Sequence, residues 1–384
     1  MKKKIIRITT IPGSMGGLLK NQLKFMANYY NVIGVSSKGE NDRLKQVGIE
    51  QGVRVTNVEM TRTISPIKDL KSLYALYKIL KLEKPHIVHT HTPKAGTIGM
   101  IASRLANVPH RLHTIAGLPL VEATGFKRFI LNNVEKLTYS CATKIYPNSF
   151  GLKKIILNEK FTKESKLKVI GQGSSNGIDT SHFDPNLYDK TLKKQLKEKL
   201  NITENDFIFI FVGRLVGDKG INELVEAFCE INKTFNNTKL LLVGAEEKKL
   251  DPLLPETTNK IKANSNIIET GWANDVRPYL AISDVLTFPS YREGFPNVVM
   301  QACAMELACI VSDINGCNEI IKQGLTGFII PKKDTNSLYD ALVSVLSKKE
   351  QILEMGLLSR KNIIKNYEQR VVWKAILKEY NQLN

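Results

Sequence analysis

Glu293 stands between an apolar run and a predicted helix, where a carboxylate side chain could meet a ligand. The run Val285–Phe288 predicts a buried strand, and Pro296 suits the first turn of a helix because the N–H that it lacks would be unpaired there. The turn between them follows the carboxyl end of a strand, where open α/β sheets bind ligands, and free amides at a helix start favour an anion. A phosphate-bearing substrate beside Glu293 is therefore the first hypothesis.

A second loop with anion-binding character follows the apolar run 207–212. Its sequence from Gly213 to Gly220 is Gly-Arg-Leu-Val-Gly-Asp-Lys-Gly. Arg214 offers a planar fork of donors and Lys219 a compact charge, and the glycines let the backbone approach an anion closely. Together the two side chains predict a diphosphate site, whereas either charge alone would fit an ordinary surface loop equally well.

Gly16, Gly17 and two histidines are weaker signals in the first half. The Gly16-Gly17 pair follows the first predicted strand, but such pairs are more often tight turns, and the fingerprint Gly-x-Gly-x-x-Gly is absent. His89 and His91 alternate at a strand end, yet a metal pair without nearby carboxylates would be incomplete. Because no Asp-x-Asp occurs in the chain, we expect a metal-independent site and no cofactor.

Apolar, β-branched runs alternate with amphipathic helical segments along the whole chain. The predicted strands are 5–10, 31–36, 53–58, 86–90, 111–115, 143–146 and 167–170, then 207–212, 239–243, 266–269, 285–288, 309–312 and 327–330. This repeated alternation predicts an α/β protein with two doubly wound, Rossmann-like parallel sheets. Polar and glycine-rich loops follow the strands in both halves, so we expect the two carboxyl edges to face one cleft.

These elements suggest where the domains begin and end. We expect an N-terminal domain of residues 1–185 and a second domain of residues 186–365, followed by a helix over 366–384 as a candidate to pack back on the first. No stretch has the length of a membrane span, and the apolar run behind the basic N-terminus stops at Pro12, too soon for a secretory signal. Five scattered cysteines indicate neither disulfides nor zinc. We therefore expect a cytoplasmic protein.

The excess of positive charge lies entirely in the first half of the chain. Residues 1–180 hold 29 Lys and Arg against 11 Asp and Glu, and the rest holds 26 of each, so the first half carries the whole net charge of +18. This asymmetry predicts that the N-terminal domain faces a lipid headgroup, a diphosphate-linked substrate or nucleic acid, unless the lysines are simply solvated.

Two helical segments of the first half bear on that question. The segment 65–84 predicts a basic amphipathic helix that covers a sheet, with Ile67, Leu70, Leu73, Leu76 and Leu80 inward. In the segment 118–136, Lys127 and Arg128 stand between two phenylalanines. Aromatic and basic side chains together are typical of a surface that meets anionic lipid.

Three spaced motifs resemble the retaining glycosyltransferase family 4, which has the GT-B fold. They are Gly-Arg-x-x-x-x-Lys-Gly at 213–220, Pro-Ser-x-x-Glu-Gly-Phe-Pro at 289–296 and Asn-Gly-Ile-Asp-Thr-x-x-Phe at 176–183. The resemblance implies a nucleotide-sugar donor held mainly by the second domain and an acceptor held by the first. It assigns Arg214 and Lys219 to the diphosphate, Glu293 to the donor sugar, and the loop of Gly16 and Gly17 to a neighbouring phosphate.

The resemblance also supplies further candidates and two departures. The remaining donor-binding candidates are Gly213, Gly271, Phe295, Asn297, Val298 and Gln301, and the acceptor candidates are His91, His113, Lys127 and Arg128. Gln301 stands where the family usually has a second Glu for the ribose, and it keeps an acceptor oxygen while losing the charge. Ala116 stands where the family often has a His before Gly117.

Together the resemblance and the charge imply a peripheral-membrane glycosyltransferase. It would move a sugar from UDP-hexose or UDP-N-acetylhexosamine to a polyprenyl-diphosphate-linked saccharide, in the synthesis of bacterial capsule, O-antigen or another surface polysaccharide, on the cytoplasmic face of the membrane. The family implies retention, with the leaving diphosphate accepting the proton on the same face, whereas retaining hydrolases use two close carboxylates.

The nearest rival is a nucleotide-sugar epimerase on the same scaffold, which needs no acceptor. Nucleic-acid binding fits the charge alone and is not expected, because no readout module is recognisable.

Overall fold

A computed structural model of the chain describes residues 2–61, 65–118, 120, 123–247 and 251–383. Their contacts divide the chain into two compact units, one of Met1–Asn176 with Arg370–Asn384 and one of Gly177–Gln369. The first division precedes the expected boundary at residue 185, and the return to the first unit follows residue 369 rather than 365. The cleft expected between two sheet edges stays a prediction.

The first unit is built on a six-stranded parallel sheet in the order β3-β2-β1-β4-β5-β6. The strands are β1 (Lys4–Ile8), β2 (Asn31–Ser36), β3 (Arg54–Asn57), β4 (Ile87–Thr90), β5 (His110–Ile115) and β6 (Lys144–Pro147). In the register Ile6 lies opposite Ile33 of β2 and Val88 of β4. This is the doubly wound order that the alternation predicts.

The strand predicted at 167–170 is wrong. Leu167 forms a single bridge with Ile145 of β6, and the Lys168 amide donates to the Ile145 carbonyl at 3.1 Å. The next rung of a parallel ladder would need the N–H of residue 147. Because Pro147 has no N–H, the pairing stops after one bridge.

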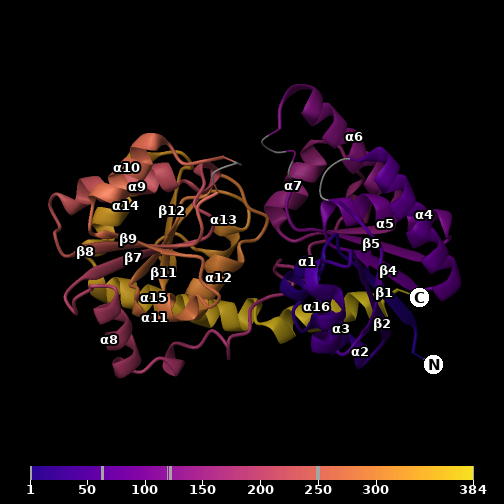
Figure 1. Cartoon of the computed structure of the whole chain (residues 1–384), viewed down its shortest axis with the longest axis horizontal. Coiled ribbons are helices and arrows are strands. Elements are labelled where there is room, and N and C mark those ends of the chain that lie inside the picture. Colours follow the sequence, from indigo (N-terminus) through magenta and orange to yellow (C-terminus); the bar gives the residue numbers. More distant parts are fainter. Residues whose placement is uncertain (1, 62–64, 119, 121–122, 248–250, 384) are drawn as a thin grey trace. The chain divides into compact units, whose positions relative to one another are not determined.

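Helices cover both faces of this sheet (Figure 1). One group is α1 (Pro12–Leu18), α2 (Gln22–Ala27), α3 (Arg43–Gln51) and the C-terminal α16 (Gln369–Asn381); the other is α4 (Pro66–Glu83), α5 (Pro93–Leu105), α6 (Gly125–Cys141) and α7 (Phe150–Asn158). In the first group Ile376 and Tyr380 of α16 belong to one apolar cluster with Met15 and Leu23. The C-terminal helix thus packs within the N-terminal unit.

Helix α4 does not bury the side chains that its periodicity suggests. Leu76 and Leu80 are buried, but Ile67 and Leu70 are 75% and 67% exposed. The buried positions Ser72, Leu76 and Leu80 recur every four residues, and at about 100° per residue Leu70 lies on the opposite side of the helix from Ser72. The first turns of α4 therefore present apolar side chains to solvent.

The second unit has its own six-stranded parallel sheet, in the order β12-β11-β10-β7-β8-β9. Its strands are β7 (Phe207–Val212), β8 (Thr238–Val243), β9 (Ile267–Gly271), β10 (Val285–Phe288), β11 (Ala308–Ser312) and β12 (Gly327–Ile330). All residues of β7 and β10 are buried, as expected for central strands covered on both faces.

Three sets of contacting helices surround this second sheet (Figure 1). Helix α9 (Ile221–Asn232) contacts α10 (Pro255–Ala263) and α14 (Thr335–Leu346), while α12 (Asn297–Ala304) contacts α13 (Cys317–Ile320) and α15 (Lys349–Asn366), and α11 (Arg277–Ile282) contacts α8 (Lys190–Lys199). None of the helices in the described part of the chain combines the length and the apolar character needed to cross a membrane.

Candidate active site

Three loops meet at the carboxyl edge of the second sheet. They follow β7, β10 and β11, and they are neighbours because β10 lies between β7 and β11. The ammonium of Lys219 forms an ion pair with Oε1 of Glu293, and these side chains are only 16% and 19% exposed. Ser290 Oγ donates to the same carboxylate oxygen at 3.2 Å. The fold therefore joins the two loops that carry the strongest sequence signals.

Close backbone packing holds the Lys219 loop against the Glu293 loop. Gly220 has a left-handed backbone with φ +72°, and a Cβ there would lie 2.2 Å from the Pro289 carbonyl oxygen. The Tyr291 amide donates to the Asp218 carbonyl at 2.9 Å, and Arg292 forms an ion pair with Asp218 at 2.8 Å. Only glycine permits this approach at position 220, so the motif glycine serves loop packing.

The loop after β11 supports Glu293 from the other side. Asn315 Nδ2 donates to the carbonyl of Glu293, and to that of Gly294 at 3.2 Å. Neither Asn315 nor Ser290 is a sequence-predicted site residue. Both residues follow the end of a strand, and this position was the only signal in the sequence that could have indicated them. The direction of each side chain depends on the neighbouring loop, which the sequence pattern does not specify.

Helix α12 starts directly after the Glu293 loop. Pro296 is its N-cap residue, and among the described residues no side chain caps this end. Asn297 is exposed, so the first amides of α12 are free to meet an anion. Val298 and Gln301 are half-buried. The Phe295 ring, in contrast, is buried against Tyr367 at 5.3 Å between centroids and belongs to the core, so a donor contact of Phe295 stays a prediction.

Arg214 lines a separate pocket of about 350 Å³ formed by the loops after β7, β8 and β9. Its side chain is exposed and makes no hydrogen bond or ion pair with any residue in the described ranges. Gly213 and Gly244 line the same pocket, and a Cβ on Gly244 would lie 1.8 Å from the Gly213 carbonyl oxygen. Trp272, which is 75% exposed, adds an aromatic wall directly after the positive-φ Gly271. Sequence reasoning missed Gly244 and Trp272.

Gly16 and Gly17 do not form the predicted loop. They lie in the last turn of helix α1, which begins at Pro12 directly after the end of the first strand region. A Cβ on Gly16 would lie 3.3 Å from Val47 Cγ2 of α3, so this position allows close helix packing. Gly16 sits inside the helix, so the expected loop conformation is wrong, while a contact of Gly16 and Gly17 with a phosphate stays a prediction.

The histidines proposed for acceptor contact lie in the interior of the first unit. His91 is 3% exposed, and its Nε2 accepts a hydrogen bond from Arg7 Nε at 2.9 Å. His113 is 4% exposed and bonds Thr90 Oγ1 through Nδ1 at 2.8 Å. Burial lowers the pKa of His113 to about 4 and holds the pKa of His91 well below its usual value. Both rings are therefore neutral at pH 7, and their contact with an acceptor stays an untested prediction.

The depressed pKa of His113 predicts a pH-dependent stability. The unfolded chain binds a proton on this ring below pH 6.5 whereas the folded protein does so only near pH 4. Stability is therefore expected to fall between pH 6.5 and 4, by about 1.4 kcal/mol per pH unit for this one group. Urea unfolding at several pH values should show a slope reduced by one proton in His113→Gln. An unchanged slope would contradict the assignment.

The two basic acceptor candidates differ in their surroundings. Lys127 is exposed on α6. Arg128 forms an ion pair with Glu159 at 2.5 Å and also donates to the Leu120 carbonyl. Arg128 thus ties α6 to the end of α7, while Lys127 remains on the surface.

The metal alternative rests on His89 and His91, whose rings are tilted against each other with centroids 4.2 Å apart. Both nitrogens of His89 are within hydrogen-bond distance of protein hydroxyls, namely Tyr380 at 2.5 Å and Thr114 at 2.7 Å. Within the described ranges, His, Cys, Asp and Glu form no group of three or more that could hold a metal ion. Whether the reaction uses a metal stays untested.

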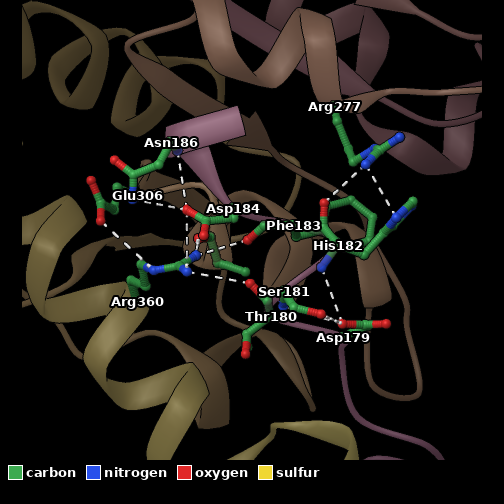
Figure 2. Close-up of polar contacts among 11 residues, drawn as sticks. Asp179, Thr180, Ser181, His182, Phe183, Asp184, Asn186, Arg277, Glu306 and Arg360 are labelled. Atoms are coloured by element: carbon green, nitrogen blue, oxygen red, sulfur yellow. Dashed lines mark hydrogen bonds and ion pairs between the residues drawn. The ribbon is translucent and has the colours of Figure 1, made fainter. Parts of the chain in front are cut away.

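The motif at 176–183 has a structural role. Figure 2 shows Asp179 accepting from the amides of Ser181 and His182, both at 3.1 Å, in a tight turn. Arg360 of α15 donates to the carbonyls of Thr180 and Phe183 at 3.3 and 2.8 Å. The Ile178 amide also donates to the Tyr367 carbonyl at 2.8 Å. The motif therefore fixes the start of the second unit to its last helix.

Two glycosyltransferase family models match the chain in the order of its two units. The glycosyl transferase 4-like model matches residues 15–149, and the glycosyl transferases group 1 model matches residues 193–370. The capsular polysaccharide biosynthesis glycosyltransferase CapM of Staphylococcus aureus is 33% identical over 382 residues, covering 99% of this chain and 97% of the relative. This chain belongs to the glycosyl transferases group 1, of the glycosyl transferase 4-like type.

Further similarities agree with this glycosyltransferase assignment. The UDP-Gal:alpha-D-GlcNAc-diphosphoundecaprenol alpha-1,3-galactosyltransferase of Escherichia coli is 36% identical over 295 residues, which cover 76% of this chain and 74% of the relative. The crystal structure of Anabaena HepE in complex with UDP has a TM-score of 0.82 at 15% identity, covering 99% of this chain and 100% of that one. The fold is GT-B, as the motifs imply, and no observation favours the epimerase.

Proposed function

We propose that this glycosyltransferase moves a hexose or N-acetylhexosamine from a UDP-sugar to a polyprenyl-diphosphate-linked saccharide in bacterial surface polysaccharide synthesis. The observation that carries the donor part is the ion pair of Lys219 and Glu293 beside the uncapped start of α12. A cation, a carboxylate and free helix amides at one sheet edge match the diphosphate and the hydroxyls of a nucleotide sugar.

The pocket next to this pair suits the nucleoside. Gly213 and Gly244 line the pocket without side chains that would occupy it. The exposed Trp272 ring offers a flat apolar surface on which a base could stack. Arg214 lines the same pocket and has no partner among the described residues. We assign Arg214 and Lys219 to the diphosphate and Glu293 to the sugar hydroxyls. Gly271, Asn297, Val298 and Gln301 complete the proposed donor site.

Charge neutralisation is the catalytic task of this site. The bond between the anomeric carbon and the diphosphate oxygen breaks, and the acceptor oxygen bonds to that carbon on the same face. The acceptor's hydroxyl proton passes to the departing phosphate oxygen. When the diphosphate binds, the ammonium of Lys219 leaves its ion pair with Glu293 and pairs with a phosphate oxygen. The Glu293 carboxylate can then accept a hydrogen bond from a sugar hydroxyl. Arg214 and Lys219 then stabilise the leaving charge without a metal, so activity should survive EDTA.

The acceptor part rests on relatives and on charge. The names of the relatives from Escherichia coli and Campylobacter jejuni specify undecaprenol-diphosphate-linked sugars. The excess of Lys and Arg in residues 1–180 suits an anionic membrane surface and a diphosphate. Peripheral binding to the cytoplasmic face of the membrane is part of this proposal.

A panel of UDP-sugars tests the proposed reaction. Each sugar is incubated with the protein and undecaprenyl-diphosphate-linked GlcNAc, and the lipid is weighed by mass spectrometry. We expect a mass shift of one hexose or N-acetylhexosamine with one donor, in EDTA as well. No shift with any donor, or epimerised UDP-sugar without acceptor, would overturn the proposal. Sedimentation with phosphatidylglycerol vesicles and with neutral vesicles tests the membrane part.

Gln301→Glu is expected to preserve or strengthen donor binding. Gln301 is half-buried one turn into α12, and a carboxylate there would accept hydrogen bonds from ribose hydroxyls with the help of its charge. The UDP dissociation constant, measured by calorimetry, should stay equal or fall by up to about tenfold. Gln301→Leu, which removes the acceptor oxygen, serves as the control and should weaken binding. A large loss of affinity in Gln301→Glu would refute the ribose contact.

A further inference from the structure

An apolar groove of about 750 Å³ lies between α4, α5 and α6 of the first unit. Its walls are Leu70 and Leu73 of α4, Ile98 and Ile101 of α5, and Leu131 and Val134 of α6. The volume falls in the range of pockets that bury a small ligand. Glu135 also lines the groove, and burial raises the pKa of its carboxyl, which favours the uncharged form.

One end of the groove is polar. Thr10 and Ser14 follow β1, and Thr92 and Lys94 follow β4, so these residues lie at the carboxyl edge of the sheet. Lys94 forms an ion pair with Asp69 at 2.6 Å, and the second oxygen of Asp69 is buried without a hydrogen-bond partner among the described residues. This end thus offers hydroxyls, the ammonium of Lys94 with its partner Asp69, and the start of the 13-residue helix α5, which no side chain among the described residues caps.

The first turns of α4 and α6 also expose apolar side chains to solvent, and Leu70 both lines the groove and is exposed. Ile67 and Leu70 of α4 are 75% and 67% exposed, and Phe126 and Phe129 of α6 are 76% and 64% exposed. The two phenylalanine rings stack at 6.4 Å, with the exposed Lys127 between them in sequence. Such a surface suits the boundary between lipid headgroups and chains.

We propose that the groove holds the isoprene units nearest the diphosphate of the acceptor lipid, with the diphosphate at the end formed by Thr10, Thr92 and Lys94. An amphiphilic ligand fits this groove, because an apolar trough ends in hydroxyls and the Lys94–Asp69 ion pair at the carboxyl edge of the first sheet. The positive charge of this half complements a diphosphate, which a protein helix with an apolar face would lack. This inference rests on the proposed lipid-linked acceptor.

Leu70→Asp tests the groove in steady-state kinetics. Because Leu70 is 67% exposed, we expect the variant to fold. The new aspartate would place a negative charge in the groove, which Leu70 lines. We expect the KM for undecaprenyl-diphosphate-linked GlcNAc to rise about tenfold. The kcat/KM for a water-soluble acceptor, with the same sugar diphosphate on a methyl group, should stay unchanged. Leu82→Asp is the matched control, because Leu82 is 81% exposed on α4 but does not line the groove. Equal KM values in the two variants would overturn the proposal.

A binding experiment separates this inference from the proposed reaction. Undecaprenyl diphosphate with a photoreactive group on its chain is crosslinked to the full chain in detergent, and the labelled peptides are mapped. We expect labels in α4, α5 and α6 that excess undecaprenyl diphosphate removes and inorganic diphosphate or phosphatidylglycerol does not. Labels elsewhere, or a chain whose groove is covered by a second copy in solution, would overturn the groove assignment. Specific groove labelling without sugar transfer would instead refute only the proposed reaction.

Discussion

Lys219→Ala and Arg214→Ala are each expected to lower kcat/KM for sugar transfer about 10²–10³-fold, the loss typical when one donor to a developing anion is removed. Lys219 sits in the loop that Gly220 packs against Pro289, and its ammonium pairs with Glu293. Arg214 lines the adjoining pocket, and its side chain has no partner in the described ranges. We therefore expect Arg214→Ala to lower the stability of the fold only slightly.

Initial rates with the active UDP-sugar and circular dichroism measure transfer and folding in parallel. Lys262→Ala is the matched control, because Lys262 is exposed on α10 and lies outside the proposed site. We expect native spectra for all three variants and full activity only for Lys262→Ala. Full activity in both Lys219→Ala and Arg214→Ala would refute the diphosphate assignment.

Glu293→Gln is expected to lower kcat about 10²-fold while the UDP dissociation constant changes less than about threefold. The amide keeps the size of the side chain and a bond to Ser290, but it loses the charge that would accept a hydrogen bond from the sugar hydroxyl once Lys219 has turned to the diphosphate. Because UDP lacks the sugar, its affinity reports on the diphosphate alone. The effect should therefore appear in the chemical step.

Calorimetry with UDP and initial rates with UDP-sugar separate the two quantities. Glu269→Gln serves as the control, since Glu269 is exposed on the edge strand β9. If Glu293→Gln weakened UDP binding as much as it lowered kcat, Glu293 would act on the diphosphate through Lys219. Unchanged transfer would exclude Glu293 from the site.

The loops around Glu293 could be placed from the sequence because each follows a short apolar run. Strand and helix periods are local, and the carboxyl ends of parallel strands share one edge, so the positions of residues 213–220 and 290–296 follow from the pattern. The same locality explains the wrong strand at 167–170, where the partner β6 ends at Pro147 and cannot donate the next bond.

The first unit shows where periodicity stops being informative. Ile67 and Leu70 have the spacing of buried residues, yet the buried stripe of α4 runs through Leu76 and Leu80 on another side of the helix. His91 and His113 have the chemistry of acceptor contacts but lie inside. Which side of a helix or strand is covered depends on its neighbours, and a single sequence does not specify them.

The sequence by itself determined that Glu293 stands at a helix start, that Arg214 and Lys219 follow a strand, and that the pattern is that of a two-sheet glycosyltransferase. Only the tertiary structure decided that Lys219 pairs with Glu293, that Asn315 supports the loop, and that the Phe295 ring belongs to the core. The reason is the sheet order: β10 lies between β7 and β11, so residues far apart in the chain meet at one edge through contacts that local patterns do not encode.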